Sequence, residues 1–187
     1  MASTSDFRNG YTFKEKGILF SIIEFQHVKP GKGGAFVRTK LRNIKTKAVI
    51  DRTFRAGEKV EQVRLERKQY DYLYKDGNFL VYMDNETYDQ IQVEQEILGD
   101  SIKFLKENDT CGILFHGDKP IEVEIPTFVE LKITATEPGF KGNTASNTQK
   151  PAQLETGATV SVPLFIEEGT VIKVDTRTGE YIERVNK

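Results

Sequence analysis

One lysine of this sequence is flanked by residues that leave space around it. The segment Lys29–Gly34 (KPGKGG) places Lys32 two residues after a proline and between glycines. Proline and glycine favour a tight turn, and glycines carry no side chain that would crowd the lysine. Lys32 can therefore project as an isolated amine, whose three donors on a flexible stem suit phosphate or ribose oxygens. The alternative is an ordinary surface turn that contains a lysine. The residues that would shape this loop are Pro30, Gly31, Gly33 and Gly34.

The sequence offers few groups for acid–base, nucleophilic or metal chemistry. Its one cysteine, Cys111, and its two histidines, His27 and His116, have spacings that match no catalytic pair. It lacks the GxSxG, Walker-type, GxGxxG and HExxH motifs. Paired carboxylates such as Glu122 and Glu124 fit a solvated strand face. We therefore expect no catalytic residue, no metal site and no cofactor, in a protein that is not an enzyme.

Charge is distributed unevenly along the 187 residues. Residues 1–64 carry 14 Lys and Arg against 6 Asp and Glu, whereas residues 65–128 carry 6 against 14. Residues 129–187 are nearly neutral, so the formal net charge of −1 conceals a net +8 followed by a net −8. A strongly basic segment suits a polyanion, and the phosphate backbone of nucleic acid is the commonest large one. The alternative is an uneven charge that serves only solubility.

Composition sets the cellular setting that we expect. The chain is 37% hydrophobic and 29% charged, as in an ordinary globular protein. Its single cysteine excludes an internal disulfide. No apolar run approaches the roughly 20 residues of a membrane helix, and the first residues lack a secretory pattern. We expect a cytoplasmic monomer with no membrane partner.

Most of the chain has the pattern of short strands. The segments Gly17–Val28 and Ala35–Leu41 are rich in β-branched and aromatic residues, and they flank the loop of Lys32. The dipeptide Asp76-Gly77 predicts another tight hairpin, since it favours positive φ. Many short strands separated by turns are typical of small barrels or sandwiches.

Two segments depart from the strand pattern. Val93–Lys106 has apolar residues at helical spacing, although Gly99 weakens the prediction of a helix. Glu137–Gly157 is long and polar, so it is either a disordered linker or an ordered functional loop. The charge changes near residues 64 and 128 coincide with breaks in the pattern and favour three domains of about 60 residues.

A series of sequence blocks, taken in order, resembles the bacterial translation elongation factor P family. The resemblance covers nearly the whole chain, and the order and spacing of the blocks make it specific. The blocks are DFRNG (6–10), FQHVKPGKGGAFVRTKLRN (25–43), TFRAGEKV (53–60), YLYKDGNFLVYMDNETYDQ (72–90), KPAQLETGATVSVPLFIEEG (150–169) and DTRTGEYIERV (175–185).

The resemblance implies an all-β protein of three small β-barrel domains with an elongated, tRNA-like shape. Residues 1–64 would form an SH3-like (KOW-like) amino-terminal barrel that carries the loop of Lys32. Residues 65–128 would form an acidic OB-fold, and residues 129–187 a second OB-fold at the carboxy terminus.

The resemblance also implies a function in translation. Family members bind the ribosome between the peptidyl and exit tRNA sites and relieve stalling at consecutive prolines. The lysine that matches Lys32 contacts the CCA end of peptidyl-tRNA and is commonly lengthened by a lysine-modifying enzyme. Lys32 would then position the tRNA and would not act as an acid or base. The implied partners are the ribosome, peptidyl-tRNA, ribosomal RNA and, beside the acidic domain, ribosomal protein L1.

Other residues become candidates for RNA contacts. Lys29 and Arg38 are the strongest because they flank the loop of Lys32. Tyr181 and Arg184 match positions that the family uses against tRNA, by stacking and by phosphate pairing; the alternative is a partly buried strand tyrosine and a rim arginine. The remaining cations of the basic segment are Arg8, Lys40, Arg42, Lys45 and Arg55.

A loop of the third domain matches the one that the family places near the exit-site codon of the mRNA. Its residues are Gly142, Asn143 and Thr144. The family commonly has aspartate at the middle position; asparagine keeps an acceptor oxygen and adds a donor, but it loses the charge.

Two other functions remain as alternatives. One is an elongation-factor-P-like paralogue. The other is a generic OB-fold protein that binds single-stranded nucleic acid, which would need aromatic platforms interleaved with cations on the OB domains. The acidic middle domain counts against the second alternative.

Overall fold

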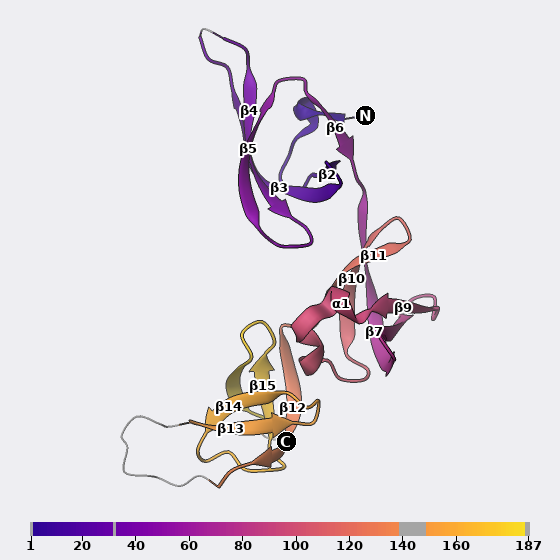
Figure 1. Ribbon diagram of the computed structural model, residues 1–187, viewed down its shortest axis with the longest axis vertical. Helices are drawn as coiled ribbons and strands as arrows, with labels where there is room; N and C mark the ends of the chain where they lie inside the picture. The colour runs from indigo at the N-terminus through magenta and orange to yellow at the C-terminus, as the bar shows by residue number, and fades with distance from the viewer. Residues whose placement is uncertain (1, 32, 139–148, 186–187) are drawn as a thin grey trace. The chain divides into compact units, whose positions relative to one another are not determined.

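The computed structural model describes residues 2–31, 33–138 and 149–185, and most of their regular structure is β-strand (Figure 1). Three sheets follow one another along the chain. The predicted all-β class, built on barrel-like sheets, is confirmed. No helix within these ranges has the length and apolar character needed to cross a membrane.

The first sheet has six strands in the order β1-β6-β2-β3-β4-β5. Side chains alternate between its two faces, and one face closes over a core rich in phenylalanine. The rings of Phe7, Phe13 and Phe54 lie with their centroids between 5.3 and 5.9 Å apart. The elements are β1 (Ala2–Ser3), the 3₁₀ turn η1 (Thr4–Asp6), β2 (Thr12–Glu15), β3 (Ile18–Val28), β4 (Phe36–Asn43), β5 (Val49–Arg55) and β6 (Lys59–Gln62).

The second sheet has five strands in the order β11-β10-β7-β8-β9. The predicted hairpin at Asp76-Gly77 is confirmed: it joins β7 to β8, and Gly77 has a φ of 56°. Leu80 and Ile113 are fully buried in the core of this sheet. The strands are β7 (Leu65–Asp76), β8 (Phe79–Asp84), β9 (Gln90–Glu94), β10 (Thr110–His116) and β11 (Lys119–Glu124).

The predicted helix over Val93–Lys106 is only partly right. Strand β9 continues to Glu94, the helix α1 spans Gln95–Leu98, and the 3₁₀ turn η2 spans Gly99–Phe104. Gly99 has a φ of 58°, in the left-handed region, which ends a right-handed helix. The apolar spacing of the segment is therefore real, but it is divided between a helical turn and a 3₁₀ turn.

The third sheet also has five strands, in the order β14-β13-β12-β15-β16. Leu131, Ile133, Val162 and Ile172 are fully buried between its strands. The strands are β12 (Phe128–Thr136), β13 (Gln149–Leu154), β14 (Thr159–Pro163), β15 (Val171–Asp175) and β16 (Glu180–Arg184).

The chain divides into two compact units. Unit 1 comprises Met1–Arg67 with Leu114–Glu122, and unit 2 comprises Lys68–Ile113 with Val123–Lys187. The end of the hairpin formed by β10 and β11 therefore contributes to unit 1, although both strands belong to the second sheet. The domain boundaries at residues 64 and 128 stay a prediction.

Candidate nucleic-acid interface

The loop that contains position 32 connects two long strands of unit 1. Strands β3 and β4 pair antiparallel up to Val28 and Phe36, so the loop begins beyond the last ladder pair (Figure 1). Lys29, Pro30, Gly31, Gly33 and Gly34 are all exposed. Gly33 has a φ of 115°, a conformation that side-chain-bearing residues rarely adopt. The expected turn chemistry is present on both sides of Lys32, which itself lies outside the described residues.

Three cations of β4 share the outer face of the sheet. Val37, Thr39 and Leu41 are buried, so the residues between and after them point outward by the two-residue period of a strand. The outward residues are Arg38, Lys40 and Arg42.

A β-bulge in β3 decides which side chains stand beside these cations. The pairing shifts between Ile22, which is buried opposite Leu41, and Glu24, which lies opposite Lys40. The bulge thereby turns Glu24 and Gln26 to the outer face. The sequence alone could not place Glu24 and Gln26 beside these cations, because it carries no glycine or proline that would mark the bulge.

Arg38 stands between neutral strand neighbours on this face. It stands opposite Gln26 on β3 and Thr53 on β5, two neutral residues. A hollow of about 440 Å³ lies over the three strands, and its lining also includes Glu24 and Asp51. Within the described ranges Arg38 forms no ion pair, and its guanidinium lies 5.5 Å from the centroid of the Phe36 ring. A planar guanidinium between neutral donors is suited to bind a phosphate.

Lys40 is less available than Arg38. Its Nζ lies 3.2 Å from Oε2 of Glu24, and Asp51 stands opposite it on β5. Arg42 is exposed and lies opposite Ser21 and Val49. Its strand neighbours are therefore uncharged, as those of Arg38 are.

The remaining cations of the basic segment are spread over unit 1. Arg55 is exposed opposite Phe36, beside the base of the loop, and its backbone N–H donates to Glu58. Lys45 lies in the β4–β5 turn. Arg8 lines a separate hollow of about 360 Å³ with Asp6, Tyr11 and other residues. The structure therefore groups Arg38, Lys40, Arg42 and Arg55 on the β4–β5 surface and places Arg8 elsewhere.

The candidates of the third sheet lie on its edge strand β16. Tyr181 is half-buried against the core and pairs with Val174, whereas Arg184 is exposed and pairs with Ile172. Tyr181 is partly buried and partly exposed, which fits both a packing role and a contact with RNA. The codon-loop candidates Gly142, Asn143 and Thr144 lie outside the described residues.

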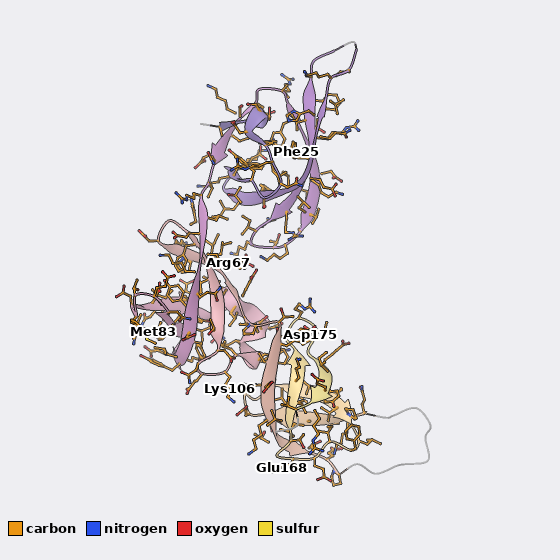
Figure 2. The ribbon with its side chains drawn as sticks, turned by 180° about the vertical axis from the view of Figure 1, so that it is seen from behind. Phe25, Arg67, Met83, Lys106, Glu168 and Asp175 are labelled. Carbon is orange, nitrogen blue, oxygen red and sulfur yellow. The ribbon has the colours of Figure 1, made fainter. Side chains whose placement is uncertain are left out.

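Cys111 and His27, two of the groups considered for catalysis, lie in different settings. Cys111 is fully buried, and burial raises its pKa to about 12, so the thiol stays protonated at neutral pH. His27 is exposed, and its ring contacts that of Phe25 with centroids 5.7 Å apart (Figure 2 labels Phe25). Among the residues that the structure describes, no group of three or more His, Cys, Asp or Glu side chains is arranged to hold a metal ion.

Sequence comparison accounts for nearly the whole chain. Residues 3–60 match the model of the elongation factor P KOW-like domain, residues 65–123 that of the elongation factor P OB domain, and residues 129–184 that of the elongation factor P carboxy-terminal domain.

The chain belongs to the elongation factor P family.

Individual members of the family align over their full length. The elongation factor P of Agathobacter rectalis is 56% identical over 185 residues, which covers 99% of this chain and 100% of the relative. The elongation factor P of Acetivibrio thermocellus is 52% identical over the same shares of both chains. This chain is thus a translation elongation factor that acts with the ribosome.

A solved structure has a similar fold over about two thirds of this chain. The translation initiation factor eif-5a family protein of Naegleria fowleri superposes with a TM-score of 0.54 at 14% identity. The match covers 66% of this chain and 96% of that protein. At this identity the likeness concerns the fold alone.

Proposed function

We propose that this elongation factor P binds the ribosome between the peptidyl and exit tRNA sites and relieves stalling at consecutive prolines. Lys32 positions the CCA end of peptidyl-tRNA, and the cations of the β4–β5 surface hold the RNA backbone. The observation that carries this proposal is the combination, in one hairpin, of a glycine-framed lysine and outward cations on the adjoining strand. Family membership supplies the ribosomal setting.

The proposed mechanism is positioning without chemistry by the factor. Proline is a restricted nucleophile, because its ring fixes φ and limits how the nascent chain can be arranged. Holding two reactants in a productive geometry lowers a barrier by as much as about 7–11 kcal/mol in favourable intramolecular cases. A fraction of that suffices here. The ribosome makes the bond, so the factor needs no catalytic residue, metal or cofactor.

A covalent extension of Lys32 fits the same role. The exposed residues on both sides leave room for a modifying enzyme to reach the amine. A longer arm carries the donor deeper into a narrow site while the barrel stays outside. The intact mass of the native protein, followed by mapping of the peptide from Phe25 to Arg38, tests this extension.

The other two sheets are proposed to make secondary contacts. Tyr181 and Arg184 contact tRNA, and Gly142, Asn143 and Thr144 approach the exit-site codon. The middle sheet presents exposed carboxylates, and we assign them to a basic partner such as ribosomal protein L1. These carboxylates belong to Glu86, Asp89, Glu94, Glu96 and Asp100.

Replacing the lysine tests the proposal in cells. In a strain without its own elongation factor P, Lys32→Ala is expected to accumulate normally yet to lose rescue of a polyproline reporter by at least about tenfold. Lys59→Ala, which removes an exposed lysine of unit 1 outside the loop, is the matched control and should rescue. Full rescue by Lys32→Ala would refute the assignment of Lys32.

A further inference from the structure

One aromatic side chain that precedes β10 is buried in the core of the third sheet. Phe104 ends η2, and only 3% of its surface is exposed. The cluster that buries it consists of residues of the third sheet and its loops, among them Leu131, Ile133 and Val174. A segment at the edge of one barrel thus completes the core of the next, inside unit 2.

The ring of Phe104 rests on a glycine of the β15–β16 turn. A Cβ built on Gly179 would lie 3.4 Å from Cζ and 4.0 Å from Cε2 of Phe104, which is van der Waals contact, so a side chain longer than a methyl group would press on the ring. Gly179 also has a φ of 72°, which favours glycine. The positive φ therefore calls for glycine at this position, and the contact with Phe104 limits the size of any replacement.

The turn that presents Gly179 is held rigidly from within. The guanidinium of Arg177 donates to both carboxylate oxygens of Asp175, from Nε at 3.0 Å and from Nη2 at 2.6 Å. These bonds lower the pKa of Asp175 to about 2. The N–H of Gly179 donates to the carbonyl of Asp175 at 2.8 Å, and the hydroxyl of Thr176 donates to the carbonyl of Pro126 at 2.8 Å.

Polar contacts lie on both sides of Phe104 (Figure 2 labels Lys106 and Asp175). The hydroxyl of Thr156 donates to the carbonyl of Lys103 at 2.6 Å. Nζ of Lys106 lies 2.9 Å from Oε1 of Glu155, which also accepts the N–H of Lys132 at 3.0 Å. An apolar contact flanked by directional bonds resists both sliding and separation.

We propose that Phe104 is a positioning residue that, seated on Gly179, holds residues 68–113 and 123–187 as one rigid body. The β15–β16 turn leads directly into Tyr181, two residues after Gly179. Phe104 therefore fixes where the third sheet presents Tyr181 and Arg184 relative to the acidic sheet. The rigid body follows from the contacts alone, whereas its role on the ribosome rests on the proposed function.

The test compares two pairs of variants in the full chain, by ¹⁵N relaxation. Phe104→Ala removes the ring, and Val174→Ala shortens a buried side chain of the same cluster that belongs to the third sheet only. Gly179→Val adds atoms where a Cβ would already touch the ring, and Gly169→Val does so at a similar φ of 83° with nothing within 4 Å. If Phe104→Ala does not fold, the two valine variants alone test whether the contact between Phe104 and Gly179 holds unit 2 together.

In the wild type, Val174→Ala and Gly169→Val, both parts of unit 2 should tumble with one correlation time. In Phe104→Ala and Gly179→Val the two parts should tumble separately, and the amide of Leu105 should exchange about tenfold faster. Separate tumbling in the wild type would overturn the proposal. The proposal would also be overturned if Phe104→Ala and Val174→Ala, or Gly179→Val and Gly169→Val, changed the tumbling of unit 2 equally.

The role on the ribosome has its own readout. Gly179→Val should rescue a polyproline reporter less well than Gly169→Val, by about threefold or more. Equal rescue, with tumbling changed as expected, would refute the positioning role of Phe104 in the proposed function. Failure of the proposed function itself would show in Lys32→Ala, which leaves this contact untouched.

Discussion

At the scale of single residues, neighbours decide which cations are free to bind phosphate. Arg38 and Lys40 lie on the same face of β4, and the sequence alone does not show that their neighbours differ in charge. The bulge in β3 brings Glu24 within 3.2 Å of Lys40 and leaves neutral residues beside Arg38. An existing ion pair must be broken before Lys40 can bind RNA, whereas Arg38 loses no partner.

This difference predicts unequal effects of two matched substitutions. Arg38→Gln should weaken ribosome binding about tenfold at low salt, because one phosphate contact is lost. Lys40→Gln should cost about threefold or less, because its charge is already paired. The difference in ribosome affinity between Arg38→Gln and the wild type should narrow as the salt concentration is raised. The wild type makes one more phosphate contact, so its affinity falls more steeply with salt. Equal losses, or a deficit independent of salt, would contradict the phosphate role.

At the residue scale, local chemistry sufficed to predict an exposed turn around position 32. The exposed, glycine-rich surroundings of position 32 follow from turn propensities, whereas the positive φ of Gly33 is a finding of the structure. The neighbours of Arg38 depend on the register of three strands, which a bulge changes by one residue. That register is a tertiary property, so Gln26 and Thr53 could not be named beforehand.

At the scale of elements, the turn between β15 and β16 shows how a charged pair organises a loop. Asp175 is largely buried and accepts from the backbone and the side chain of Arg177. These bonds favour the carboxylate, so the pKa of Asp175 falls from 3.8 to about 2. The lowered pKa means that the pair stabilises the folded state above pH 3.8 and loses this contribution as the pH falls toward 2.

Asp175→Asn should therefore lower the melting temperature at pH 7 by a few degrees, and the gap to the wild type should close as the pH falls from 3.8 to about 2. Thermal unfolding followed by circular dichroism measures this. Arg177→Gln should reproduce the effect, because it removes the other partner. A gap that persists unchanged at low pH would show that the carboxylate is not the stabilising group.

The segment from β9 to η2 shows where apolar spacing does not suffice to predict secondary structure. Its apolar spacing predicted one helix, yet the left-handed Gly99 divides it into α1 and η2. The side chain that the spacing could not assign is Phe104, whose burial depends on the third sheet. Local periodicity indicates that a residue is buried, but it does not say in which core.

At the scale of the whole molecule, the opposite charges of the first two thirds suit a factor that meets RNA and protein together. The basic segment carries the loop of Lys32 and the cations of β4, and every strand of the second sheet lies in the acidic segment. Charges of one sign on each part orient the factor during encounter with a polyanionic particle. We expect the lysine arm to be productive only when the remaining contacts fix the factor in place.

The most direct measurement is the rate of proline–proline bond formation on purified ribosomes at saturating factor, with factor binding measured in the same reactions. Wild-type protein should accelerate the bond, and Lys32→Ala should bind within about twofold yet accelerate it at least about tenfold less. Equal acceleration by Lys32→Ala, at equal occupancy, would contradict the claim that this lysine positions the peptidyl-tRNA.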